Sequence, residues 1–141
     1  MLEKHKLFGD ELLIHTPVML RNRWQLTLNY YKDFLENNYK PEAFVELVEY
    51  ILTQDYADKL YPGTSVGNLL ISKPIDGKLN FQKTLKISDR HYDNKLELRY
   101  SDLDLIDNRD DYENAILWKV DCYEYQLIKK FKEFISWKKD W

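Results

Sequence analysis

The spacing of apolar residues changes at Tyr61-Pro62-Gly63, and this change limits the folds open to the chain. Before it, apolar residues recur three and four positions apart, as on one face of a helix. After it, they alternate with polar residues, as in strands that bury one face. Three of the four glycines, Gly63, Gly67 and Gly77, lie at or after this point, where turns between strands would use them. The sequence therefore predicts helices followed by an antiparallel sheet.

Two helices are expected before this change. Thr16 can cap the first helix, and Pro17 occupies its first position, where no backbone N–H is needed. This helix should end near Asn37-Asn38, and its apolar stripe consists of Leu20, Trp24, Leu28, Tyr31 and Leu35. The second helix opens at Pro41 and runs to about Thr53. Its apolar stripe consists of Phe44, Leu47, Val48, Ile51 and Leu52.

Four strands and a closing helix are expected after the change. The alternating segments are residues 68–72, 79–87, 95–101 and 115–122. A three-residue loop, Ile75-Asp76-Gly77, is favoured between the first two strands because it pairs Ile71 with Phe81 on the apolar face, whereas a two-residue Asp76-Gly77 turn separates them. The closing helix carries an apolar stripe of Leu127, Ile128, Phe131, Phe134 and Ile135.

These elements define an α+β fold in a single domain, residues 1–141. The expected order is two N-terminal helices, a four-stranded antiparallel meander and a C-terminal helix, packed as a two-layer sandwich. A length of 141 residues leaves no room for a second domain of ordinary size, and 44% apolar residues suffice for one packed core.

The single cysteine, Cys122, cannot form an internal disulfide or a cysteine-built metal site, so a reducing compartment is the natural interpretation. No apolar run has the length of a signal peptide core or of a membrane span. The sequence thus predicts a cytoplasmic protein that does not interact with membranes.

Motifs that would carry catalysis are weak. Residues 63–67, Gly-Thr-Ser-Val-Gly, match the nucleophile elbow of serine hydrolases, but a helix should follow the serine and here a strand is expected, so we interpret them as a turn. His5, His15 and His91 lack the spacing of metal ligands. No phosphate-binding loop is present and the net charge is −3, so neither a cofactor nor nucleic acid is expected.

The strongest anomaly is residues 102–113, which hold six acidic residues and one basic residue. An EF-hand calcium loop would need a ligand at the third ligand position, where Ile106 stands, and a glycine after it, which is missing. A solvated loop is one interpretation, since most charge runs simply stay in water. The other is a surface for a basic partner, because nearby tyrosines are common in interface cores and opposite charges speed encounter.

We take the interface as the leading hypothesis, with a contact surface of Asp102, Asp104, Asp107, Asp110, Asp111, Tyr100 and Tyr112. A small, acidic, tyrosine-rich α+β domain with one cysteine resembles small bacterial immunity proteins in general character. That resemblance implies a non-enzymatic protein-binding or inhibitory domain that occludes a basic protein. The alternative is a small enzyme or ligand-binding domain with a pocket between the helices and the sheet. A self-associating subunit, a homo-oligomer, is a third possibility.

Overall fold

The computed structural model describes residues 13–36, 42–90 and 93–141, and it confirms an α+β chain with an antiparallel sheet and a C-terminal helix. The helices are α2 (Pro17–Glu36), α3 (Glu42–Leu52) and α4 (Leu127–Trp137). The strands are β1 (Tyr61–Ser65), β2 (Asn68–Ser72), β3 (Lys83–Arg90), β4 (Lys95–Asp102) and β5 (Ile116–Tyr123). Four short 3₁₀ helices complete the described elements: η1 (Asp55–Asp58), η2 (Leu103–Leu105), η3 (Arg109–Ala115) and η4 (Glu124–Gln126).

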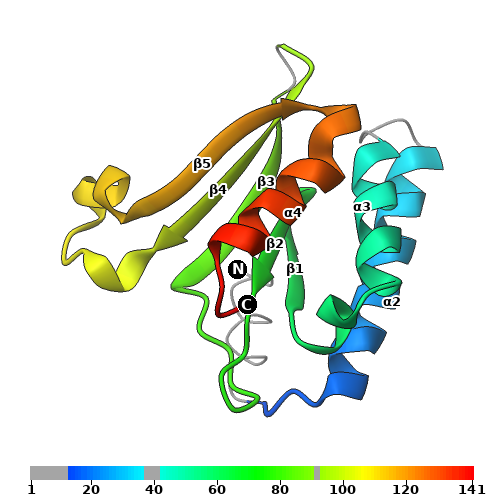
Figure 1. Cartoon of the computed structure of the whole chain (residues 1–141), viewed down its shortest axis with the longest axis horizontal. Helices are drawn as coiled ribbons and strands as arrows, with labels where there is room; N and C mark the ends of the chain where they lie inside the picture. The colour runs from blue at the N-terminus through cyan, green and yellow to red at the C-terminus, as the bar shows by residue number, and fades with distance from the viewer. Residues whose placement is uncertain (1–12, 37–41, 91–92) are drawn as a thin grey trace.

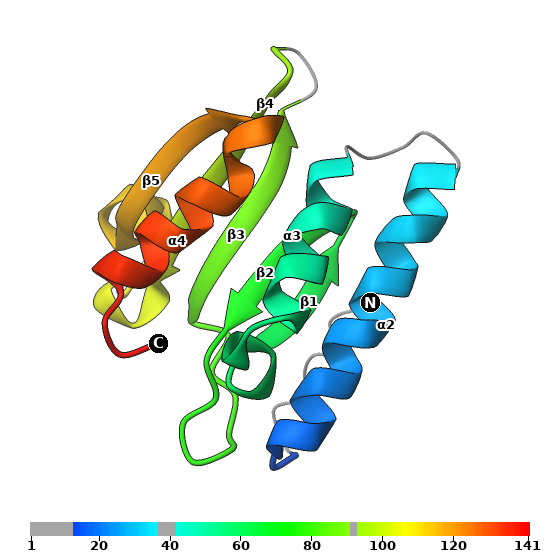
Figure 2. The same cartoon turned by 45° about the vertical axis from the view of Figure 1, so that its right-hand side comes forward.

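The sheet has the strand order β1-β2-β3-β4-β5, so each strand pairs with its neighbours in sequence. In Figures 1 and 2, α3 and α4 lie on the same face of the sheet, with α4 over β4 and β5 and α3 toward β1 and β2. The helix α2 runs beside α3 and along β1. Within the described ranges, no helix is both long and apolar enough to cross a bilayer.

The core fills the space between the helices and the sheet. The predicted stripe of α2 is buried at Leu20, Trp24, Leu28 and Tyr31, and the side chain of Leu35 lies outside the described residues. Two hydrogen bonds tie α2 to the two ends of β1. The indole Nε1 of Trp24 donates to the carbonyl of Leu60 (2.8 Å), and the hydroxyl of Tyr31 donates to the carbonyl of Gly67 (2.9 Å). Buried polar groups need such partners, so these bonds fix how α2 sits on the sheet.

The prediction of four strands was wrong, because residues 61–65 form an additional strand, β1. It pairs with β2 in a tight hairpin in which Ser65 lies opposite Asn68. The two turn residues, Val66 and Gly67, have φ angles of 51° and 81°, the left-handed values that such short hairpin turns require. Pro62 lacks a backbone N–H, and it is tolerated because β1 is at the edge of the sheet.

The predicted register of the next hairpin was also wrong. Ile71 pairs with Leu85 rather than with Phe81. The tip is the two-residue turn Asp76-Gly77, with φ angles of 53° and 78°, flanked by an isolated bridge from Ile75 to Lys78. The chain then leaves the ladder until β3 begins at Lys83. The alternation at Leu79 and Phe81 has another cause, since both side chains pack with Leu20 and Tyr61 in a small separate cluster.

The remaining elements agree closely with the sequence pattern. The strand predicted at residues 115–122 is β5, and its side chains alternate as expected, with Trp118, Val120 and Cys122 less exposed than their neighbours. The closing helix is α4, with Phe131 and Phe134 fully buried. The predicted boundaries at Asn37-Asn38 and Pro41 lie outside the described residues.

Candidate functional site

The acidic segment, which we define as residues 102–113, connects β4 to β5 and is built from two short helical turns. Each turn is capped by a side chain at its start. Oδ1 of Asp102 accepts from the N–H of Asp104 (3.0 Å) and opens η2, and Oδ1 of Asn108 accepts from the N–H of Asp110 (3.1 Å) and opens η3. The segment projects from the end of the sheet away from α2 and α3 (Figure 1).

Two of the predicted carboxylates share one lysine within the molecule. Nζ of Lys83 lies 3.1 Å from Oδ2 of Asp102 and 3.6 Å from Oδ2 of Asp104. The hydrogen bond to Asp102 raises the pKa of Lys83 above its ordinary value. Asp102 is itself buried, whereas Asp104 is exposed. Both carboxylates therefore hold the base of the acidic segment on β3.

Asp107, Asp110 and Asp111 are arranged differently. All three are exposed, and none of their carboxylates forms an ion pair with a residue of the described ranges. Glu113, in the same segment, is also exposed. These side chains concentrate negative charge at the tip of the acidic segment.

The two predicted tyrosines are not presented to solvent in the same way. Tyr100 is only 1% exposed, and its ring packs against Phe134 (centroids 5.4 Å apart) and Trp141 (5.7 Å), so it cannot offer its ring to a partner. Burial raises the pKa of Tyr100 above its ordinary value. Tyr112 is half-buried, and its hydroxyl shares a hydrogen bond with that of Ser101 (3.2 Å).

Arg99 and Leu105 belong to the site although the sequence analysis did not single them out. The guanidinium of Arg99 lies over the ring of Tyr112, 5.7 Å from its centroid, and holds η3 against the sheet. The side chain of Leu105 is 57% exposed within the acidic segment. Its signal in the sequence was an apolar residue beyond the end of an alternating strand, within the acidic segment.

A small hollow of about 220 Å³ lies beside Tyr100. It is lined by Lys73, Ile75, Asn80, Lys83, Tyr100, Lys138, Asp140 and Trp141. Each of its ammonium groups has a partner. Lys83 pairs with the carboxylates described above, Lys138 pairs with the carboxylate of Asp140 (2.7 Å), and Lys73 donates to the backbone carbonyl of Asp140. The volume is below the range of about 300–1,000 Å³ that is usual for small-molecule sites.

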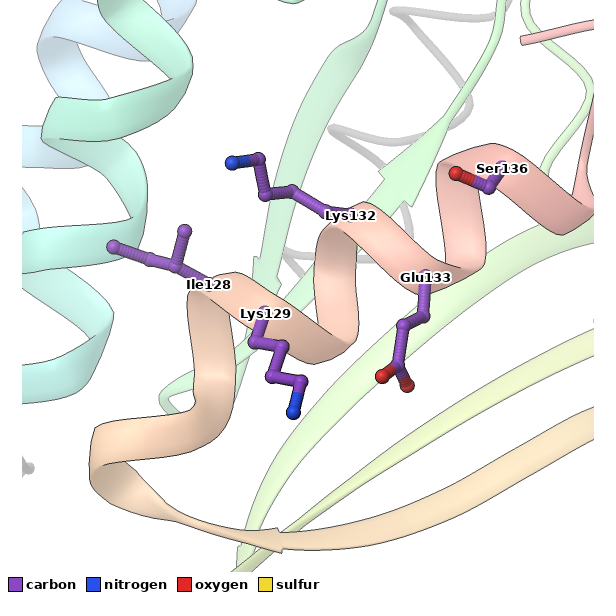
Figure 3. Close-up of a pocket in the computed structure, with 5 residues that line it drawn as sticks. All are labelled: Ile128, Lys129, Lys132, Glu133 and Ser136. Carbon is purple, nitrogen blue, oxygen red and sulfur yellow. The ribbon is translucent and has the colours of Figure 1, made fainter.

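A shallow hollow of about 500 Å³ follows the exposed side of α4 (Figure 3). In Figure 3, Ile128 and Lys132 extend toward α3, while Lys129 and Glu133 point to the other side of the helix. Lys132 lies over the ring of Tyr50, 5.5 Å from its centroid. The polar groups here diverge, so they do not form a site in which several act on one bound atom.

The other candidate chemical groups are placed as follows. Ser65 ends β1 and is followed by a turn and a strand, not by the helix that a nucleophile elbow needs. Cys122 is buried, and burial raises the pKa of its thiol to about 11, so it is protonated at neutral pH. His15 is buried against Tyr61, and His5 and His91 lie outside the described residues. No group of three or more potential metal ligands occurs in the described part of the chain.

Comparison of the chain with protein-family models, with curated proteins and with solved structures finds no match.

Proposed function

We propose that the chain is a non-enzymatic protein-binding or inhibitory domain, similar in mode of action to immunity proteins, which uses the tip of the acidic segment to bind a basic protein. The observation that carries the proposal is the exposure of Asp107, Asp110 and Asp111 without an ion pair in the described structure. Carboxylates left unpaired on a short, capped loop create a local negative potential that attracts a partner of opposite charge.

The construction of the acidic segment supports this proposal. Asp102 and Asn108 cap the two helical turns, and Lys83 ties the base of the segment to β3. Such bonds reduce the conformational entropy that the loop would lose on binding. Leu105 supplies an exposed apolar side chain in the same segment as the free carboxylates, and apolar contact provides affinity that surface charge alone seldom gives.

The sign of the charge favours a protein over nucleic acid as the partner, because phosphate backbones would be repelled by these carboxylates. A cytoplasmic location is part of the proposal. It rests on Cys122, which is free and buried, because thiols remain free in reducing compartments. Compared with the sequence hypothesis, the proposed contact surface loses Tyr100 and Asp102, which are buried, and Asp104, which pairs with Lys83. It gains Leu105.

The alternative function, a small enzyme or ligand-binding domain, would have to use a hollow such as the one beside Tyr100. Its small volume and internally paired lysines support it less well than the free carboxylates support protein binding. A small molecule that remains bound to the chain in native mass spectrometry would favour this alternative.

The experiment compares two triple variants that change the net charge equally. The first, Asp107→Asn, Asp110→Asn and Asp111→Asn, removes the proposed docking charges while preserving side-chain shape. The matched control, Glu46→Gln, Glu49→Gln and Asp76→Asn, removes three exposed charges elsewhere. Each protein is immobilised and exposed to lysate from its source cells, and any retained protein is purified and titrated against all three forms.

We expect a basic protein that is retained by the wild-type chain and by the control, and whose affinity falls roughly tenfold or more for the acidic-segment variant. The affinity of the wild-type chain should fall as salt is added. A partner that binds the wild-type chain and the acidic-segment variant equally well would contradict the proposal.

A further inference from the structure

The strand β5 forms one edge of the sheet. Lys119 and a shift of register against β4 at Tyr100 and Ser101 protect this edge only in part. In the described sheet β5 pairs only with β4, and Figure 1 shows it as the outermost strand. It is eight residues long and contains no proline. The opposite edge, β1, is five residues long and contains Pro62. Long, unobstructed edges readily pair with a further strand.

The backbone groups that point away from β4 can be assigned. The N–H of Tyr123 donates to Oε1 of Gln126 (3.0 Å), which lies outside the sheet. Backbone groups alternate in direction along a strand, so the N–H and C=O of Asp121 and Lys119 also face the open edge. A strand added there would bond to these two residues.

The side chains on the outer face of β5 have a symmetric order. Lys119 and Asp121 flank position 120, and Leu117 and Tyr123 flank this pair. All four side chains are exposed, with Leu117 at 46% and Tyr123 at 48%. Reversing the direction of the strand about Val120 exchanges the basic residue with the acidic one and the leucine with the tyrosine.

We propose that β5 pairs with β5 of a second copy of this chain, antiparallel, with the two-fold axis at Val120. In this register Lys119 lies opposite Asp121 of the other copy, and Leu117 lies opposite its Tyr123. Both are cross-strand pairs that stabilise sheets. The sheets of the two copies become one continuous sheet.

The two adjacent two-fold registers, with the axis at Lys119 or at Asp121, are less favourable for a physical reason. Two residues that lie opposite each other in antiparallel strands either both direct their backbone N–H and C=O groups at the partner strand or both direct them away. The two-fold axis can therefore lie only at a residue, and it shifts by whole residues. An axis at Lys119 places that lysine opposite itself, and an axis at Asp121 does the same with the carboxylate. Like charges directly opposite each other are destabilising. The axis at Val120 instead pairs each charge with its opposite.

The arrangement within one chain adds to this complementarity. On β4, Arg99 lies directly opposite Lys119, and Glu97 directly opposite Asp121, so β5 faces like charges on its paired side. Two contacts among the described residues relieve them: Lys119 reaches Glu97 of β4 diagonally at 3.6 Å, and Arg90 of β3 bonds to Asp121. A second copy would supply opposite charges on the open side.

The test measures the association of the full chain by sedimentation equilibrium, using charge swaps that can be undone by mixing. Lys119→Asp leaves two acidic positions in each copy, and Asp121→Lys leaves two basic ones, so each variant alone faces like charges across the axis. An equimolar mixture again faces opposite charges. We expect the wild-type chain to dimerise, each variant alone to associate about tenfold or more weakly, and the mixture to form heterodimers with nearly wild-type affinity.

A second measurement does not depend on the stability of the charge variants. In a Cys122→Ala background, Val120→Cys places two thiols opposite each other at the axis, in a pair whose Cα atoms lie about 4.5 Å apart. Oxidation should link the two copies covalently. Leu117→Cys is the control, because six residues of strand separate the two thiols by roughly 20 Å.

A wild-type chain that stays monomeric at about 1 mM would overturn the proposal. So would a dimer that is indifferent to both swaps and to their mixture, or one in which positions 117 and 120 cross-link equally. None of these measurements uses the tip of the acidic segment, so the proposed function can fail while this inference holds, and the reverse is also true.

Discussion

Lys83 and Asp102 face each other across the end of the sheet, as the first residue of β3 and the last residue of β4, with Nζ 3.1 Å from Oδ2. The other oxygen of the same carboxylate, Oδ1, accepts from the N–H of Asp104 and starts η2. One side chain thus ends a strand and begins the acidic segment. The position of the exposed carboxylates further along depends on it.

Replacing Asp102 should separate its two roles. Asp102→Ala removes the helix cap and the ion pair, and we expect it to lower the free energy of unfolding by about 1–2 kcal/mol. Asp102→Asn keeps an oxygen that can cap η2 and loses only the charge, so it should cost less than about 1 kcal/mol. Urea unfolding measures both.

The control for this pair is Asp107→Ala, since Asp107 is exposed and forms no ion pair in the described structure. Its effect should stay within about 0.5 kcal/mol. Equal losses for Asp102→Ala and Asp102→Asn would show that the cap contributes nothing.

Much of the fold could be predicted because its apolar periods are long and regular. The spacing of Leu20, Trp24 and Leu28 defined α2, and the alternation of Trp118, Val120 and Cys122 defined β5. The strand β1 could not be recognised, because Pro62 and Gly63 read as turn residues unless the strand is known to lie at an edge. The spacing of apolar residues predicts which side chains are buried, but it does not predict which element covers them.

The candidate site shows the same limit. The concentration of acidic charge was visible in the sequence, whereas the pairing of Asp102 and Asp104 with Lys83 depends on the register of β3 and β4. Tyr100 is the instructive case, since it alternates in step with Leu96 and Leu98. That pattern already placed its ring on the buried face, so its burial could have been predicted.

The turn Asp76-Gly77 should respond in opposite ways to two small substitutions. Gly77 has a φ of +78°, and a Cβ there would lie 2.6 Å from Cγ2 of Ile14, so Gly77→Ala should destabilise the chain by about 1–2 kcal/mol. Asp76, with a φ of 53°, accepts asparagine readily, so Asp76→Asn should change the stability by less than about 0.5 kcal/mol. Thermal unfolding of both variants checks this. A larger loss for Asp76→Asn would contradict the turn geometry.

Trp24 should be the tryptophan whose replacement costs most among those described. It is fully buried, and its indole N–H is the partner of the Leu60 carbonyl. Trp24→Phe leaves that carbonyl without a donor and opens a cavity, so we expect a loss of about 2–3 kcal/mol in urea unfolding. Trp137→Phe is the control, because Trp137 is 45% exposed, and it should cost less than about 1 kcal/mol. Comparable losses would indicate that the bond to Leu60 contributes little.

The buried thiol of Cys122 should make stability depend on pH in the alkaline range. Burial raises its pKa from an ordinary value of 9.0 to about 11, so the folded chain favours the neutral thiol. That contribution is fully present below pH 9 and is lost as the pH rises through about 11, because the unfolded chain releases the proton first. Lysines and tyrosines titrate in the same range, so the informative quantity is the difference in the free energy of unfolding between the wild-type chain and Cys122→Ala. We expect this difference to shift against the wild-type chain between pH 9 and pH 11 and to stay constant between pH 6 and pH 8.

The same burial should slow chemical modification of the thiol. A thiol reagent at pH 8 should modify Cys122 far more slowly in the folded chain than in urea, since the reactive thiolate is both scarce and covered. Rapid modification of the folded chain would show that Cys122 is reached through local opening of β5, the edge strand on which the proposed dimer depends.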